Sequence, residues 1–344
     1  MIKKIFIGCL LLTVCCIINT RAQATKELYA GGAMKPRIRV ITDNDFSGDP
    51  DGLFQLAHLL LSPSVEVRGI IGSHLKAGDW FDPSKTQAHD AARKAAELLG
   101  VMNLAEKVTV VAGSDTAMRT DDQSVKSEAV NLIIKEALRT DTKTPLYVIC
   151  GAGLTEIASA LLTRPEIAEK LTLVWIGGPE YPDLALPPPG SLGIEYNLNI
   201  DINAAKVIFN KSAVKLWQVP RNAYREAILS GSEILLKIKP YGEIGRYLTA
   251  QLEYTIERLK KNGVDPGETY ILGDSPLVLL TALQSPFEPD PSSSTYVIKT
   301  APKINDRGQY EFGGNGRPIR VYNYLDTRLM FNDFFAKLEL FSAK

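Results

Sequence analysis

An apolar run passes directly into four aspartates in the stretch Val40-Ile-Thr-Asp43-Asn-Asp45-Phe-Ser-Gly48-Asp49-Pro-Asp51-Gly52-Leu-Phe. The β-branched residues before Asp43 are typical of a buried strand, and the residues from Leu53 onward have a helical pattern. The carboxylates therefore lie in a turn at the carboxyl end of a strand. Ligands of open α/β sheets bind at that end of the strands, so this turn is a candidate site.

The four carboxylates fall within nine residues and repel one another, which raises the pKa of each while the others stay ionised. A bound hard cation removes this conflict, and calcium takes several carboxylate and carbonyl oxygens in a flexible shell. The alternative is a solvated acidic loop in which Asp51 caps the following helix. One aspartate would need no further explanation, but four at the end of a strand favour a metal or catalytic site.

Short β-branched runs alternate with helical patterns along the rest of the chain. This alternation predicts an α/β fold with a mostly parallel, Rossmann-like sheet flanked by helices and a C-terminal helical annex. Strands are expected at 38–41, 65–71, 108–111, 146–150, 171–176 and 214–219, with a later pair at 296–299 and 319–321. Helices are expected at 53–61, 85–99, 125–138, 155–162, 228–237, 241–259 and 329–340, with another starting near Ser275. Gly100 is expected to end the helix at 85–99, with Ser84 as its N-cap.

The N-terminus has the pattern of an export signal. Lys3 and Lys4 precede an apolar run at 5–18, and Ala22-Gln-Ala24 is a small-x-small cleavage pattern. We expect cleavage after Ala24, a single domain over 25–344 and a periplasmic or secreted protein with no membrane anchor once the signal is removed. An uncleaved anchor is the alternative, although the run is short for a spanning helix. Cys150 is then the one remaining cysteine, and its apolar neighbours predict a buried thiol.

The balance of charged residues indicates which classes of partner the protein can be expected to bind. The 344 residues carry 39 Lys and Arg against 39 Asp and Glu, and no basic stripe stands out. Phosphate binding needs clustered positive charge, so a nucleic-acid partner is not expected. The sequence leaves the oligomeric state open, with a homo-oligomer among the possibilities.

The acidic turn resembles the first motif of the inosine-uridine-preferring nucleoside hydrolase family. That motif is an Asp-x-Asp, a glycine-containing turn and an Asp-Asp pair that opens a helix. Further segments resemble the family's in the same order, over roughly residues 37–340. They are Gly151-Ala-Gly-Leu-Thr155, Leu173-Val-Trp-Ile-Gly-Gly178, Glu195-Tyr-Asn197 with Asp201 and Ala204-Ala205, and Gly273-Asp274-Ser-Pro276.

The resemblance implies a calcium-dependent hydrolase that cleaves the N-glycosidic bond of a nucleoside or related glycoside. The implied ligands of calcium are Asp45, Asp49, Asp51, the carbonyl of Thr155, and Asp274. Asp45 is also the implied general base for the attacking water. The sugar hydroxyls would be held by Asp51, Glu195 and Asn197.

Three positions depart from the family's pattern. Gly52 stands where the second Asp of the pair is usual, and Gly273 stands where many members have a histidine that helps the leaving base to depart. Gly72-Ser-His74 replaces the usual Gly-Asn after the second strand. Because His74 follows a strand, it is expected to line the pocket, whereas His58 and His89 are expected to be packing and peripheral residues. Trp80 and Phe81 are either packed aromatics or residues that stack on a base.

Two other hypotheses about the function stay open. A haloacid dehalogenase-type phosphatase also begins with a strand and Asp-x-Asp, and would use magnesium and an aspartyl phosphate. That reading does not explain Asp49-Pro-Asp51 or Glu195-Tyr-Asn197. A sugar- or nucleoside-binding protein that has lost catalysis would account for Gly52 and Gly273.

Overall fold

A central sheet of eight strands organises the chain, in a computed structural model that describes residues 35–191, 193–285 and 294–343. The predicted export signal lies outside these residues. Six strands run parallel: β1 (Ile38–Asn44), β2 (Val65–Gly72), β3 (Val110–Ala112), β4 (Leu146–Cys150), β5 (Leu171–Ile176) and β6 (Lys215–Val219). Then β12 (Pro318–Tyr324) pairs parallel with β6, and β9 (Thr295–Thr300) pairs antiparallel with β12.

The strand order, β3-β2-β1-β4-β5-β6-β12-β9, gives the sheet a switch point. From β1 the chain builds outward first to β2 and β3, and then returns to place β4 on the other side of β1. Such a reversal leaves a crevice at the carboxyl ends of the two central strands, where ligands bind in open α/β sheets. The acidic turn follows β1 and therefore opens into this crevice.

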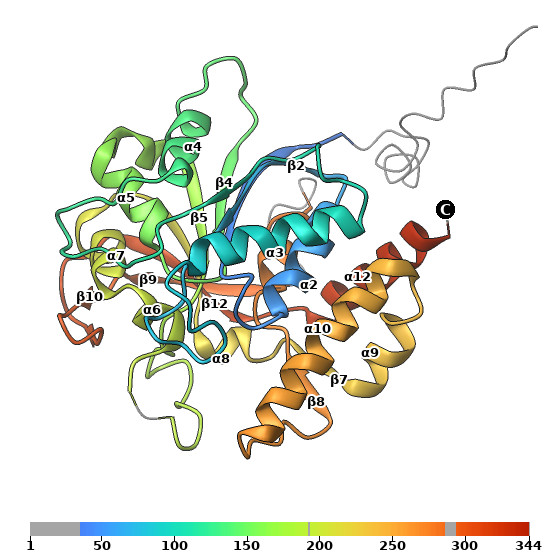
Figure 1. Ribbon diagram of the computed structural model, residues 1–344. Helices are drawn as coiled ribbons and strands as arrows, with labels where there is room; N and C mark the ends of the chain where they lie inside the picture. Colours follow the sequence, from blue (N-terminus) through green and yellow to red (C-terminus); the bar gives the residue numbers. More distant parts are fainter. Residues whose placement is uncertain (1–34, 192, 286–293, 344) are drawn as a thin grey trace, which may run out of the picture.

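Helices cover both faces of the sheet (Figure 1). Residues that alternate along a strand point to opposite faces, so Val40 packs in one apolar core and Ile41 in the other. The first core is shared with α2 (Asp51–Leu60), α3 (Gln87–Val101), α10 (Gly242–Lys261), α11 (Pro276–Leu279) and α12 (Thr327–Ser342). The second is shared with α4 (Glu128–Ala137), α5 (Thr155–Thr163) and α7 (Ile202–Lys206). Burial on both faces explains why β4 and β5 are almost continuously apolar.

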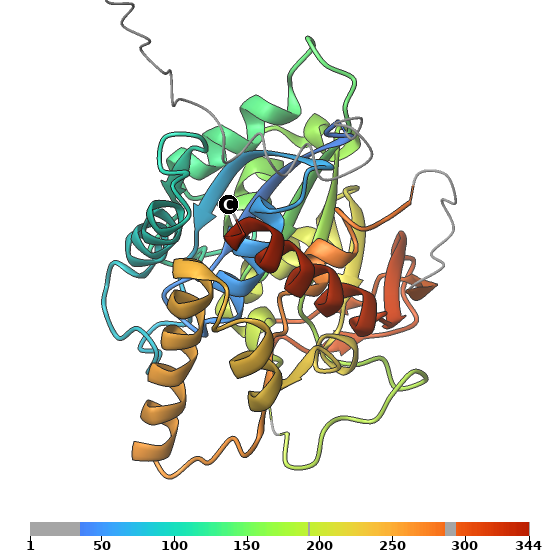
Figure 2. The same cartoon turned by 90° about the vertical axis from the view of Figure 1, so that its right-hand side faces the viewer.

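Shorter elements complete the fold. They are a 3-10 turn at Pro165–Glu169, α6 (Tyr196–Ile200), a π-helical turn at Val207–Lys211, α8 (Arg221–Tyr224), β7 (Ile228–Ser230), α9 (Gly231–Lys237), β8 (Thr269–Ile271), β10 (Lys303–Ile304) and β11 (Tyr310–Glu311). The helices α9 and α10, together with the β7–β8 pair, project beyond the sheet in two views (Figures 1 and 2). They form the C-terminal helical annex, and α12 packs on the same side.

Three expectations about elements need correction. The segment 228–237 is not one helix, because Ile228–Ser230 pairs with Thr269–Ile271 and a capping box between Ser230 and Glu233 starts the helix only after it. Gly100 does not end α3, which continues to Val101 before Asn103 turns the chain with a positive φ of 57°. The Ser84 hydroxyl bonds the carboxylate of Asp90 instead of capping that helix.

The cysteine and two histidines lie where the sequence predicts. Cys150 is fully buried in the second core. His58 is buried in α2 and bonds Asp333 of α12 at 2.7 Å, whereas His89 is exposed beside Asp115. These contacts give His58 and His89 structural partners away from the crevice.

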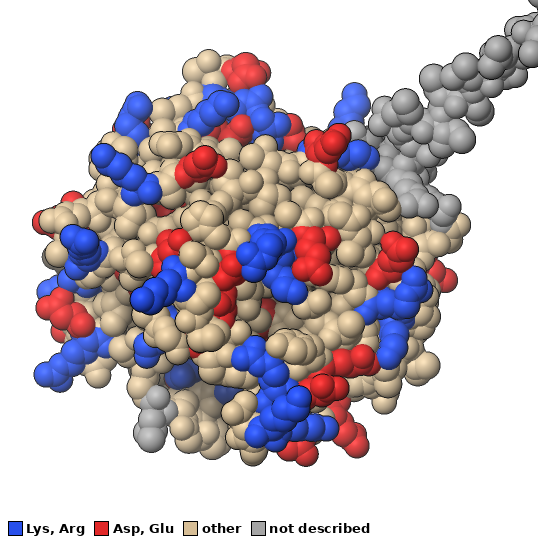
Figure 3. Space-filling model, in the orientation of Figure 1, with Lys and Arg blue, Asp and Glu red and all other residues tan. Residues whose placement is uncertain are grey.

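The surface carries both signs of charge. On the face drawn in Figure 3, basic and acidic side chains are interspersed instead of gathered into one-sign patches. Among the described residues, no helix combines the length and the hydropathy that a bilayer-spanning segment requires.

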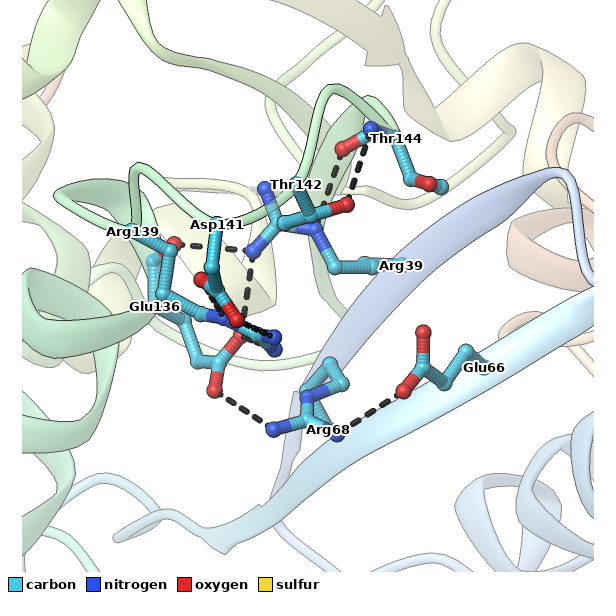
Figure 4. Close-up of polar contacts among 8 residues, drawn as sticks. All are labelled: Arg39, Glu66, Arg68, Glu136, Arg139, Asp141, Thr142 and Thr144. Carbon is cyan, nitrogen blue, oxygen red and sulfur yellow. Dashed lines mark hydrogen bonds and ion pairs between the residues drawn. The ribbon is translucent and has the colours of Figure 1, made fainter.

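A buried ion-pair network ties the sheet to α4 (Figure 4). Arg39 of β1 donates to the Glu136 carboxylate at 3.0 Å and to the backbone carbonyl of Thr144. Arg68 of β2 bonds Glu136 at 2.9 Å on one side and Glu66 on the other. Both Arg39 and Glu136 are buried, so their charges depend on each other for solvation.

Replacing Glu136 by Gln should therefore destabilise the fold. The substitution leaves Arg39 buried without a counter-charge, which costs about 3 kcal/mol when one partner of a buried pair is lost. Urea denaturation of the variant measures this. Glu66→Gln is the matched control, because Glu66 contacts the same network from a half-exposed position, and it should cost less than about 1 kcal/mol. Equal losses in the two variants would contradict the assignment of Glu136 as the centre of the network.

Candidate active site

A cavity of about 250 Å³ opens at the carboxyl ends of β1 and β4, at the switch point of the sheet. It is lined by Asp45, Asp49, Asp51, Leu75, Phe81, Gly151, Ile176, Glu195, Tyr196, Asn197, Tyr224, Ile271, Gly273 and Asp274. Small-molecule sites occupy about 300–1,000 Å³, so the cavity is slightly smaller than that range. Its size suits one small ligand and not a polymer.

Hydrogen bonds link the aspartates of the cavity across distant parts of the chain. The amide of Asp274 donates to the Asp51 carboxylate at 3.2 Å, although 223 residues separate them. The amide of Asp51 donates to Asp49 at 3.2 Å, and the hydroxyl of Tyr270 donates to Asp49 at 2.8 Å. Asp51 is the first residue of α2, whose N-cap is Pro50. The Asp51 side chain therefore does not act as the simple helix cap of the alternative reading.

Burial raises the pKa of these carboxyls, and their mutual repulsion adds to the effect. The pKa of Asp49 rises to about 6 and that of Asp274 to about 7, mainly through burial. For Asp45 and Asp51 the pKa lies well above the usual value, because burial is reinforced by the charges of Asp274 and Asp49. Without a cation, the cluster therefore retains protons into the neutral range.

The donor chemistry of this cluster suits calcium, which binds hard carboxylate oxygens. Asp45, Asp49, Asp51 and Asp274 are of the right type, and a cation would relieve the repulsion that raises their pKa values. In the part of the chain that the structure describes, no three or more Asp, Glu, His or Cys side chains already surround one point as metal ligands do. Three of the carboxylates accept hydrogen bonds within the protein: Asp49 from Tyr270, Asp51 from the amide of Asp274, and Asp274 from Asn44.

His74 and Thr155 form a buried network and do not line the cavity. The Nδ1 of His74 donates to the Leu75 carbonyl at 2.8 Å, and its Nε2 lies 3.0 Å from the Thr155 hydroxyl. That hydroxyl donates to Asp201 at 2.7 Å. The expectation that His74 lines the pocket is not met, because both ring nitrogens have partners in the protein and Leu75 takes the lining position. Thr155 is the first residue of α5, and its hydroxyl is held in this network.

Glu195 lies in the cavity wall, but its two oxygens are fully engaged. It caps α6 by accepting from the amides of Asn197 and Leu198. It also accepts from the amide of Gly178 at 2.7 Å and the hydroxyl of Tyr224 at 2.9 Å. Since a carboxylate has about four acceptor sites, a sugar hydroxyl would have to share one of them.

The side chain of Asn197 is hydrogen-bonded to the ends of two strands. Its Nδ2 donates to the carbonyls of Gly151 and Ile176, each at 2.8 Å, so α6 is tied to the ends of β4 and β5. Both amide protons are then used. The side-chain oxygen is the polar atom of Asn197 that remains for a ligand.

Tyr224 and Tyr196 are cavity residues that the motif analysis did not single out. Tyr224 follows β6 on α8, so the strand-end rule is the signal that could have found it. A Cβ added to Gly273 would lie 3.3 Å from the Tyr224 ring and 3.3 Å from the Asp51 carboxylate. The Tyr224 ring therefore lies beside the space where a side chain at position 273 would begin. Tyr196 donates to Asp79 at 2.7 Å and so connects α6 to the loop after β2.

The cavity combines negative charge with apolar and aromatic walls. None of its lining residues is Lys, Arg or His, and Phe81 lines it whereas its neighbour Trp80 does not. Such a lining stabilises positive charge that develops on a neutral ligand. None of these lining residues is a basic side chain that would pair with a phosphate group.

Comparison with known families places the chain among glycosidic hydrolases. A model of the family described as inosine-uridine preferring nucleoside hydrolase matches residues 40–321. The match covers the sheet from β1 to β12 and every residue that lines the cavity. No curated protein matches the chain.

Solved structures show the same fold at low identity. A purine-preferring ribonucleoside hydrolase from Gardnerella vaginalis is 18% identical with a TM-score of 0.67, over 89% of this chain and 100% of that chain. A plant nucleoside hydrolase is 17% identical with a TM-score of 0.64, over 88% and 99%. An inosine-uridine preferring nucleoside hydrolase from Bacillus anthracis is 16% identical with a TM-score of 0.59, over 88% and 99%.

The raised pKa values predict how stability depends on pH. A carboxyl whose pKa is raised by folding stabilises the fold at low pH, and this stability is lost as pH rises through the folded pKa. In a chelator, the melting temperature should therefore fall from pH 5 to pH 8. Asp45→Asn removes one of the repelling charges, so it should raise the melting temperature at pH 8 and have little effect at pH 5.

Thermal melts of the unchanged protein and of Asp45→Asn between pH 5 and pH 8 measure this difference in melting temperature. Glu106→Gln, at an exposed acid, is the matched control and should leave the pH dependence unchanged. A lower melting temperature for Asp45→Asn at pH 8 would show that repulsion at Asp45 does not limit stability.

Proposed function

Because the chain belongs to the inosine-uridine preferring nucleoside hydrolase family, we propose that it hydrolyses the N-glycosidic bond of a nucleoside or related glycoside with the help of calcium. The observation that carries the proposal is the cluster Asp45, Asp49, Asp51 and Asp274 in a small cavity at the switch point. Hydrolases of this family act on nucleosides, and the three solved relatives are named for that activity.

The chemistry explains why carboxylates suit this reaction. Breaking an N-glycosidic bond leaves oxocarbenium character on the sugar, which nearby negative charge stabilises. When bound, calcium would hold sugar hydroxyls and lower the pKa of a water molecule. Asp45, Asp49, Asp51 and Asp274 are the residues proposed to hold it, with Thr155 expected from the family resemblance to add a carbonyl.

We assign the remaining roles, the general base and the contacts to the sugar and the leaving group, to residues that line the cavity. Asp45 is the proposed general base, because it follows β1 directly and lines the cavity. Asp51, Glu195 and Asn197 are the proposed partners of the sugar hydroxyls, with Asn197 offering its side-chain oxygen. The apolar surface of Phe81 and the aromatic ring of Tyr224 suit a flat, uncharged leaving group.

The test is release of reducing sugar from a panel of ribonucleosides and other glycosides, in calcium and in a chelator. We expect release in calcium and its loss in the chelator. Asp45→Asn should lower turnover by at least about 100-fold, the usual contribution of a general base, while the protein stays folded. Near-normal turnover in Asp45→Asn would remove Asp45 from the role of base.

A second candidate function is ligand binding without turnover. Gly273 favours it, because no side chain at this position can help a leaving group to depart. In that case calcium and a nucleoside would raise the melting temperature, yet no compound in the panel would release sugar. The cavity lining gives the phosphatase alternative no Lys or Arg side chain to pair with a phosphate ester.

We also propose that the chain acts outside the cytoplasm, on the basis of the signal predicted at residues 1–24. Fractionation of producing cells, followed by N-terminal sequencing, should recover an exported protein that begins at Thr25. Recovery of a cytoplasmic protein that retains Met1 would contradict the proposal.

A further inference from the structure

The side chain of Asn44 is fully buried between two glycines at the base of the acidic turn. A Cβ added to Gly52 would lie 2.9 Å from the Asn44 Nδ2 and 3.1 Å from its Cγ. A Cβ added to Gly151 would lie 2.7 Å from the same Cγ. The separations of 2.9 and 2.7 Å are shorter than Cβ atoms tolerate, and 3.1 Å is tight. The Asn44 amide therefore fills the space that a side chain at position 52 would enter.

The Asn44 amide connects two of the acidic residues. Its oxygen accepts from the backbone amide of Asp45 at 2.9 Å, and its Nδ2 donates to the Asp274 carboxylate at 2.8 Å. Since a backbone N–H can only donate, the bond to Asp45 fixes which end of the amide is oxygen. The Asn44 nitrogen must then face Asp274. The turn after β1 and the loop after β8 are joined through this one side chain.

We infer that Asn44 is a positioning residue, which takes the place of the carboxylate that the family's pattern has at position 52. This inference rests on the proposed function, because the pattern belongs to the hydrolase family. An amide at this place holds Asp45 and Asp274 in position without adding a fifth negative charge to the cluster. Residues 44 and 52 therefore act as a pair: either an amide from 44 or a carboxylate from 52 occupies the buried space.

A double-mutant cycle tests whether the two positions share this space. Its members are Asn44→Ala, Gly52→Asp and the double variant. The primary measurement is calcium affinity by isothermal titration calorimetry, with the melting temperature in a chelator as a readout that requires no metal. Sugar release is the third measurement.

Each single variant should weaken calcium binding by roughly tenfold or more, as loss of a group that orients metal ligands does. Gly52→Asp should also lower the melting temperature, because the new side chain collides with Asn44. The double variant should bind calcium more tightly and melt higher than Gly52→Asp alone, since the carboxylate enters the space that Asn44 leaves. A side chain that only filled space would not give this recovery of calcium affinity.

Asn210→Ala is the matched control. Like Asn44, the Asn210 amide makes two hydrogen bonds, here both to the backbone of Ile304, but Asn210 does not line the cavity. Its loss should lower the melting temperature without changing calcium affinity or turnover.

Three results would overturn the inference. In the first, the losses of calcium affinity in the two single variants multiply in the double variant. In the second, Asn44→Ala binds calcium with the affinity of the unchanged chain. In the third, Gly52→Asp alone binds calcium more tightly and keeps its melting temperature. If the unchanged chain binds calcium without releasing sugar, the proposed function is contradicted, but the double-mutant cycle still tests the inference through calcium affinity and melting temperature. A chain that neither releases sugar nor binds calcium would overturn both.

Discussion

Four carboxyls, those of Asp45, Asp49, Asp51 and Asp274, are buried together at the carboxyl end of the sheet. Their pKa values rise mainly because burial removes the water that would solvate the charged form, and repulsion from the neighbouring carboxylates adds to the rise at Asp45, Asp51 and Asp274. Such a cluster lowers stability unless the surrounding fold holds it in place or a cation neutralises it. Functional sites commonly carry a stability cost of this kind.

The surrounding fold holds the four aspartates in place. β1 is buried on both faces and pairs with β2 and β4, so the turn that follows it starts from a fixed strand end. The Arg39–Glu136 pair fixes the beginning of the same strand to α4. Donors within the protein then orient the carboxylates, with Tyr270 at Asp49 and Asn44 at Asp274. Polar contacts at both ends of one buried strand thus keep the acidic turn in place.

Local patterns predicted much of the fold. The bounds of β4 and β5 are those expected, because uninterrupted apolar runs flanked by turns have few alternatives. The segment 228–237 was interpreted wrongly, since β7 forms only through pairing with β8, far along the chain. The late strand pair was foreseen, but its addition to the main sheet beside β6 was not. Pairing between distant segments leaves no trace in the local pattern.

The site was predictable where the family's motifs are intact. Asp45, Asp49 and Asp51 of the acidic turn line one cavity with Glu195, Asn197 and Asp274, as the resemblance implied. Asp43, the first carboxylate of that stretch, is instead buried in β1 and does not line the cavity. His74 and Thr155 do not line it. The His74 ring has buried partners instead, because strand-end position alone does not show where a side chain points. The role expected of Thr155 concerns its backbone carbonyl and stays a prediction. The role of Asn44 was also missed, since it depends on the space left by Gly52 and Gly151. Such complementarity of shape appears only after the segments have been brought together.

Calcium titration of the unchanged chain near pH 6.5, in two buffers with different heats of ionisation, tests the central claim most directly. Metal binding to carboxyls that retain protons must release those protons, and the pKa values of Asp49 and Asp274 lie about 6 and 7. We predict one calcium ion bound per chain, with a heat that depends on the buffer because protons are released. Absence of binding, or binding with the same heat in both buffers, would contradict the view that the repelling aspartates form a cation site.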